Sequence, residues 1–154
     1  MVNSRSAGIC FTANPNTGDA SKIAIEGSWG LGESVVGGIA SPDRWTLDKE
    51  TLEVVERSLG EKSMQVAFRE RGVATEELPS EKRTAFCMSD DELRRIGELA
   101  KILESHFGVP QDIEWAIDSN TPFSENIFLL QTRPEVVVKK SAIDRLLDAI
   151  IRGG

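Results

Sequence analysis

The stretch Asp112-Ile-Glu-Trp-Ala-Ile-Asp118 largely alternates polar and apolar residues, which is typical of a β-strand with one buried face. Ile113, Trp115 and Ile117 are expected on the buried face, which leaves the even-numbered residues on the opposite face. A second β-favouring run occupies residues 127–133, after a turn-rich segment at 119–126. The two runs therefore predict an antiparallel hairpin with a long loop.

Shorter β-favouring runs, separated by turn residues, fill the first half of the chain. They predict a meander of antiparallel strands, and a polar loop follows at 79–83. The predicted strands cover residues 8–12, 22–27, 44–48, 51–57, 65–69 and 73–78.

Two helices are predicted in the second half. Ser89 followed by Glu92 forms a capping-box pattern, and Gly108 with Pro110 ends the helix that this pattern begins. A second helix is expected to begin near Ser141. The fold class is therefore α+β, an antiparallel sheet with flanking helices, and residues 139–154 form a helical tail or linker.

Length and charge restrict the class of protein. The 154 residues suit one domain, and 40% hydrophobic with 28% charged residues is typical of a folded globular protein. The net charge of −7 disfavours binding to nucleic acid or to anionic lipid. Without a signal-peptide pattern or a long apolar run, the sequence predicts a cytoplasmic protein with no membrane partner.

Cysteine and histidine are scarce. Cys10 and Cys87 are the two cysteines, and their number and wide separation do not suggest a disulfide framework. His106 is the single histidine, so the sequence shows no Cys/His cluster for zinc and no plausible Ser–His–Asp triad. Its place at the end of the predicted helix favours a structural or capping role over phosphohistidine chemistry.

The predicted hairpin carries the candidate functional residues. If Glu114 and Gln131 project from neighbouring strands onto one face, they offer two oxygen ligands to a hard cation such as Mg²⁺. Arg133 would share that face, and its guanidinium suits a phosphoryl group. The spacing alone favours the simpler interpretation, a solvated sheet face that carries an ordinary Glu–Arg cross-strand pair.

The glycine-rich stretch between Gly27 and Gly38 has two interpretations. Its backbone N–H groups could hold a phosphate, or the glycines could form a tight turn into a short helix. The spacing matches neither the P-loop nor the dinucleotide-binding motif. Its role is therefore left open.

Several sequence motifs, which occur in the family's order, resemble those of the nucleotide-binding domain of the phosphoenolpyruvate synthase and pyruvate phosphate dikinase family, which includes rifampicin phosphotransferase. The resemblance covers residues 6–138. The motifs are Gly8-Ile-Cys-Phe-Thr-Ala-Asn-Pro, Ser28-Trp-Gly-Leu-Gly-Glu-Ser-Val-Val, Ser41-Pro-Asp43, Phe107-Gly-Val-Pro-Gln-Asp-Ile-Glu-Trp-Ala116 and Leu129-Leu-Gln-Thr-Arg-Pro-Glu135.

This resemblance implies an ATP-grasp fold, in which ATP lies between two α+β subdomains and residues 1–138 form the second. It implies that Glu114 and Gln131 bind Mg²⁺ and the nucleotide phosphates. Arg133 matches the family arginine that contacts the phosphates, and we assign it a catalytic role. The implied enzyme is a dikinase-type phosphotransferase of the pyruvate, water dikinase type, which passes a phosphoryl group from ATP to a histidine and then to an acceptor such as pyruvate.

The resemblance also implies missing partners. The family has an amino-terminal ATP-grasp half and a phosphohistidine domain, which this chain would need in cis or as separate subunits. One alternative is a non-catalytic fragment or assembly module that keeps the fold without turnover. A further alternative, a ligase-type ATP-grasp domain that forms an acyl phosphate, fits the sequence motifs less well.

Overall fold

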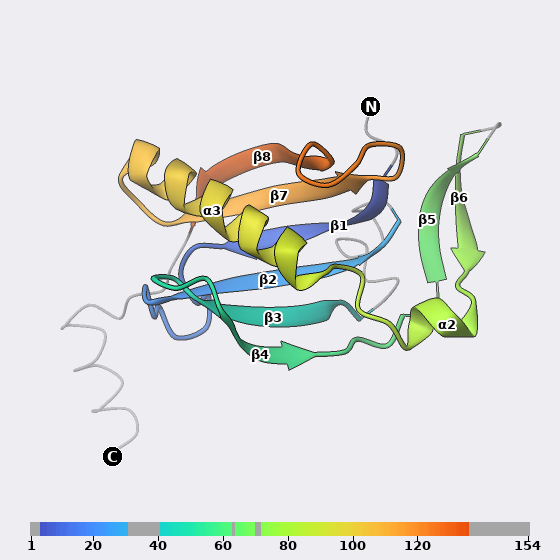
Figure 1. Ribbon diagram of the computed structural model, residues 1–154, viewed down its shortest axis with the longest axis horizontal. Coiled ribbons are helices and arrows are strands. Elements are labelled where there is room, and N and C mark those ends of the chain that lie inside the picture. Colours follow the sequence, from blue (N-terminus) through green and yellow to red (C-terminus); the bar gives the residue numbers. More distant parts are fainter. Residues whose placement is uncertain (1–3, 31–40, 63, 70–71, 136–154) are drawn as a thin grey trace, which may run out of the picture.

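The computed structural model describes residues 4–30, 41–62, 64–69 and 72–135. Figure 1 shows the antiparallel sheet of six strands, in the order β4-β3-β2-β1-β7-β8, and the separate two-stranded sheet β5-β6. The described elements are β1 (Ser4–Phe11), β2 (Lys22–Trp29), β3 (Asp43–Asp48), β4 (Val54–Ser58), β5 (Met64–Arg69), β6 (Gly72–Glu77), α2 (Ser80–Arg83), α3 (Asp90–Phe107), β7 (Gln111–Asp118) and β8 (Ile127–Pro134).

The helix α3 begins and ends where the sequence pattern predicted. The Ser89 side chain accepts a hydrogen bond from the backbone N–H of Glu92, and the Glu92 carboxylate accepts one from the backbone N–H of Ser89. At the other end, Gly108 adopts a left-handed conformation with φ of 74°. Both ends thus satisfy backbone groups that a helix leaves without internal partners.

The core lies between α3 and one face of the six-stranded sheet, which the helix crosses diagonally (Figure 1). Every second side chain of a strand faces α3, because successive side chains on a strand point to opposite faces of the sheet. Helix α3 does not cover the opposite face. The buried core residues are Cys10, Ile23, Ile25, Trp45, Leu47, Cys87, Met88, Leu93, Ile96, Ala100, Ile113, Trp115 and Ile117.

The indole of Trp115 packs across the centre of the sheet. Trp115 is paired with Gly8 on β1, which in turn is paired with Gly27 on β2. A Cβ added to Gly27 would lie 2.5 Å from the Trp115 ring, so a larger side chain there would displace the indole. Gly27 therefore leaves room for this ring, whereas a Cβ added to Gly8 would lie 1.8 Å from the Glu26 carbonyl oxygen, so Gly8 allows the close approach of β1 to the β2 backbone.

Two local predictions were wrong. The strand expected at 51–57 begins only at Val54, because Asp48 accepts backbone hydrogen bonds from Glu50 and Thr51 and so continues the turn. The segment expected as a polar loop contains α2, where Lys82 and Arg83 donate backbone hydrogen bonds to the Pro79 carbonyl. Residues 31–40 of the glycine-rich stretch and the helix expected near Ser141 lie outside the described residues.

A buried carboxylate joins three segments of the chain. The Asp43 side chain accepts hydrogen bonds from the Lys62 ammonium, from the Gly60 backbone N–H at 2.8 Å and from the Cys87 backbone N–H at 2.9 Å. The side chains of Asp43 and Lys62 are both 0% exposed. Asp43 therefore ties the first residue of β3 to the segments on either side of the β5-β6 hairpin.

The Glu92 carboxylate is expected to make stability depend on pH. Burial opposes its ionisation, but hydrogen bonds from Arg5 and Ser89 and the charge of Arg5 outweigh this effect and lower the pKa of Glu92. Because the pKa is lower in the folded chain, the carboxylate stabilises the fold above the ordinary pKa of 4.5, and this stabilisation is lost as the pH falls through the folded value.

Glu92→Gln should therefore lower the melting temperature by about 3 °C or more near neutral pH, and much less at about pH 3. Thermal unfolding of both proteins at the two pH values measures this difference. Glu98→Gln is the matched control, since Glu98 is exposed and its polar partner among the described residues is the neighbouring Arg95. An equal loss from Glu92→Gln at both pH values would contradict the role of the ionised carboxylate.

Candidate functional site

Glu114 and Gln131 lie directly opposite each other on neighbouring strands. They form a cross-strand pair of β7 and β8, and both side chains are exposed on the face that α3 does not cover. Within the described part of the chain, neither side chain has a hydrogen-bond or ion-pair partner. The predicted shared face is confirmed, and a carboxylate and an amide oxygen are both available there.

A β-bulge decides this pairing. Trp115 is paired with Leu129, but the next pair is Glu114 with Gln131, so Leu130 is an extra residue on β8. A continuous ladder would instead place Leu130 opposite Glu114. The bulge therefore brings the two oxygen-bearing side chains to one position.

Arg133 lies on the same face, two residues beyond Gln131. It is paired with Asp112, and its Nε donates to an Asp112 carboxylate oxygen at 2.9 Å. The Arg133 side chain is 70% exposed, whereas that of Asp112 is 13% exposed. The cross-strand acid partner of Arg133 is therefore Asp112, which leaves the Glu114 carboxylate without a partner among the described residues and the terminal nitrogens of Arg133 accessible.

Asp112 has a part in this site that the sequence reasoning did not assign. Its position two residues before Glu114 placed it on the correct face, and that alternation was the available signal. Its contact with Arg133 depends on the register of β8, which alternation within β7 does not specify. Asp112 holds one edge of the guanidinium and so orients the group toward the open face.

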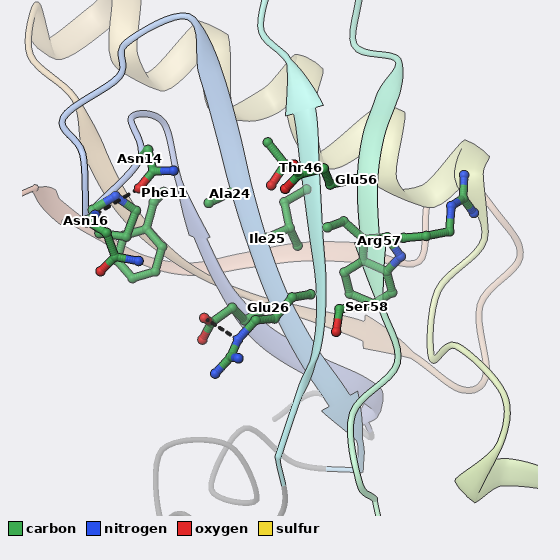
Figure 2. A pocket seen from close by; sticks show the side chains of 13 residues that line it. Phe11, Asn14, Asn16, Ala24, Ile25, Glu26, Thr46, Glu56, Arg57 and Ser58 are labelled. Atoms are coloured by element: carbon green, nitrogen blue, oxygen red, sulfur yellow. Dashed lines mark hydrogen bonds and ion pairs between the residues drawn. The ribbon is translucent and has the colours of Figure 1, made fainter.

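The same face of the sheet also carries a groove, whose lining residues do not include Glu114, Gln131 or Arg133. Across the sheet, Ile9 lies between Glu114 and Glu26, and Glu26 in turn forms an ion pair of 3.1 Å with Arg44. Figure 2 shows the groove, which has a volume of about 830 Å³ and a mainly polar lining. The residues that line it include Phe11, Asn14, Asn16, Ala24, Glu26, Arg44, Thr46, Glu56 and Ser58.

The cysteines and the histidine lie away from this face. Cys10 and Cys87 are buried free thiols, and burial is the main cause that raises the pKa of each. Such thiols are poor nucleophiles, because the reactive thiolate is disfavoured. His106 is in the last turn of α3, where its ring contacts the Phe107 ring edge-on at 4.8 Å between centroids.

Cation ligands are few in the described part of the chain. No three His, Cys, Asp or Glu side chains there converge on a common point. A cation at Glu114 and Gln131 would therefore need further ligands from water or from a bound phosphate, which is the usual arrangement for Mg²⁺ in nucleotide sites.

Neither α2 nor α3 has the length and apolar composition that a membrane-crossing helix requires.

Comparison of this sequence with known protein families shows the family to which the chain belongs. A family model described as the pyruvate phosphate dikinase AMP/ATP-binding domain matches residues 1–149. The chain belongs to this family. The predicted resemblance is therefore confirmed, including its connection to phosphoenolpyruvate synthases.

Curated relatives of this AMP/ATP-binding domain are much longer proteins. A probable phosphoenolpyruvate synthase of Staphylothermus marinus is 39% identical over 89% of this chain. The phosphoenolpyruvate synthase of Aeropyrum pernix is 38% identical, also over 89% of this chain. A probable phosphoenolpyruvate synthase of Methanothermobacter thermautotrophicus is 39% identical over 87%. The match spans only 19% to 20% of each relative's length.

Proposed function

We propose that residues 1–138 form the second subdomain of an ATP-grasp nucleotide site, and that residues 139–154 are a tail or linker. In this proposal Glu114 and Gln131 bind Mg²⁺ and nucleotide phosphates, and Arg133 contacts the transferred phosphoryl group. The observation that carries the proposal is the direct pairing of Glu114 with Gln131 on the face of the sheet opposite α3. Membership of an AMP/ATP-binding family supports the choice of nucleotide.

The residues present fit a magnesium ion. Mg²⁺ prefers oxygen ligands and keeps several waters, so one carboxylate and one amide oxygen together with phosphate oxygens are a suitable set. Both side chains are exposed and free of protein partners within the described residues, so no internal contact has to be broken. When bound, the ion would neutralise charge on the phosphoryl oxygens.

Arg133 would bind the phosphate by charge-assisted hydrogen bonds. Its Nε is held by Asp112, which fixes the plane of the guanidinium, while the terminal nitrogens remain accessible. A planar, pre-oriented cation loses little conformational freedom when it binds two phosphate oxygens. Asp112 in this proposal positions Arg133 and has no direct contact with the nucleotide.

The wider activity is proposed from the relatives. Because those proteins are about five times longer, a phosphohistidine domain and the first ATP-grasp half would lie outside the matched segment. We propose a phosphotransferase of the pyruvate, water dikinase type, in which phosphate passes from ATP to a histidine and on to an acceptor such as pyruvate. The cytoplasm is the expected compartment.

The isolated chain should bind MgATP only weakly, with a Kd above about 100 μM, since one wall of a cleft supplies only part of the contacts. An NMR titration with MgATP should shift amide signals of β7 and β8 around Glu114 and Gln131. Shifts confined to other surfaces would contradict the site. If calorimetry showed micromolar or tighter binding of MgATP to the isolated chain, it would contradict the need for contacts from the first ATP-grasp half.

A module that binds nucleotide without turnover is the second candidate, because the described residues provide ligands on only one wall. Supplying the first ATP-grasp half and the phosphohistidine domain distinguishes the two functions. Phosphate appearing on a histidine of the added domain supports the phosphotransferase. Nucleotide binding with no transfer supports the module.

A further inference from the structure

The apolar pattern of β8 does not by itself fix its register. Residues 127–130 are consecutively apolar, so the strand offers an apolar side chain to either face in two registers that differ by one residue. Among the described strands β8 is also an edge strand, and only β7 pairs with it. A specific contact is therefore needed to hold the bulged register.

The candidate site depends on that register. If the bulge at Leu130 were lost by a shift of the end of β8, Leu130 would lie opposite Glu114 and Gln131 would turn toward α3. Arg133 would lose its place opposite Asp112 in the same shift. The uncovered face would then keep a carboxylate without the neighbouring amide.

A side-chain hydrogen bond holds the end of β8 on the face opposite the candidate site. Thr132 Oγ1 donates to Gln111 Oε1 at 2.8 Å, between diagonal neighbours of β8 and β7. Gln111 is 1% exposed. Its backbone N–H donates to Thr12 Oγ1 at 2.7 Å, and its Nε2 donates to the Val109 carbonyl at 3.1 Å.

These contacts fix the acceptor that Thr132 uses. A shift of one residue would turn Thr132 to the uncovered face and leave Gln111 Oε1 buried without that donor. Glu135 adds two contacts just after β8, because its backbone N–H donates to the Pro110 carbonyl at 2.8 Å and its carboxylate accepts from the Ala13 backbone N–H at 3.1 Å. The backbone contact is possible for many residue types, whereas the Thr132–Gln111 and Glu135–Ala13 contacts each require a particular side chain, and the Thr132–Gln111 contact lies within the paired residues of β7 and β8.

We propose that the Gln111–Thr132 hydrogen bond is a register lock, and that both residues position Gln131 and Arg133 for the site. The lock concerns the pairing of β7 with β8, which does not depend on any ligand. Its consequence for Mg²⁺ and phosphate rests on the proposed function. Neither Gln111 nor Thr132 is assigned a contact with the ligand itself.

The test compares Thr132→Val, which cannot donate, with Thr132→Ser, which can. Cross-strand nuclear Overhauser effects in the full chain report whether Glu114 faces Gln131 or Leu130. Thr132→Val should show the Leu130 contact in about a tenth of the molecules or more, whereas Thr132→Ser should keep the original pairing. Thr75→Val on β6, an exposed position in the separate two-stranded sheet, is the matched control.

Unchanged pairing in Thr132→Val would overturn the lock. If that variant does not fold, the double variant Gln111→Met/Thr132→Val decides, because it removes the buried acceptor together with its donor. A mixed register in the double variant supports the lock, and one intact register overturns it.

Broadening of amide signals by Mn²⁺ with ATP provides a separate readout. In the unmodified chain, broadening around Glu114 and Gln131 tests the proposed metal site. If that broadening is absent there, the proposed function fails, while the pairing data still decide the lock. If the broadening is present, the register lock predicts that it is weaker in Thr132→Val than in the unmodified chain, and that it is of the original strength in Thr132→Ser.

Discussion

Asp43→Ala is expected to destabilise the fold by about 3–5 kcal/mol, because it leaves the Lys62 ammonium buried and without its charged partner. The same change removes the acceptor for the backbone N–H groups of Gly60 and Cys87. This loss is a large part of the stability of a typical domain. Urea denaturation followed by tryptophan fluorescence measures the change, since Trp45 lies in the core that β3 helps to form.

A double variant separates the effect of the unpaired Lys62 charge from the loss of the two backbone hydrogen bonds to Asp43. Asp43→Ala/Lys62→Met removes both charges, so it should be more stable than Asp43→Ala alone, although two backbone donors remain unsatisfied. Arg44→Ala is the control, because its ion pair with Glu26 is largely exposed and contributes little. Equal stability of Asp43→Ala and the unmodified chain would show that the buried pair does not hold these segments together.

The second large effect concerns turnover. In a chimera where residues 1–138 replace the matching segment of the Staphylothermus marinus relative, Glu114→Ala and Gln131→Ala should each lower kcat about 100-fold or more. The reason is that negative charge is redistributed over the transferred and leaving oxygens in the transition state, where a bound cation has its greatest effect. Nucleotide affinity should change much less, because other contacts hold the ground state.

The measurement is ATP-dependent phosphorylation of a histidine in the chimera, with nucleotide affinity determined in parallel. Glu98→Ala is a suitable control, since Glu98 lies on the exposed surface of α3 away from the uncovered face. Turnover within twofold of the unmodified chimera for both site variants would defeat the assignment of Glu114 and Gln131. Loss of activity in Glu98→Ala as well would indicate a folding defect of the chimera.

The sequence predicted the individual elements of this protein well. The capping box at Ser89 and the glycine at 108 fixed the ends of α3, because these signals act within a few residues of the chain. Alternation placed Ile113 and Trp115 on the buried face and Glu114 on the other, which followed from strand geometry alone. Local errors arose where a side chain continued a turn, as Asp48 does before β4.

What the sequence alone determined is therefore the type of each main element, the face of β7 on which Glu114 lies, and the motifs that carry the family resemblance. Only the tertiary structure decided that β1 lies between β2 and β7, that Glu114 faces Gln131 across a bulge, and that Asp112 is the partner of Arg133. The physical reason is the sequence separation between the residues that interact. Strand alternation and helix caps depend on neighbouring residues, whereas strand order, register and the buried Asp43–Lys62 pair depend on contacts between segments far apart in the chain.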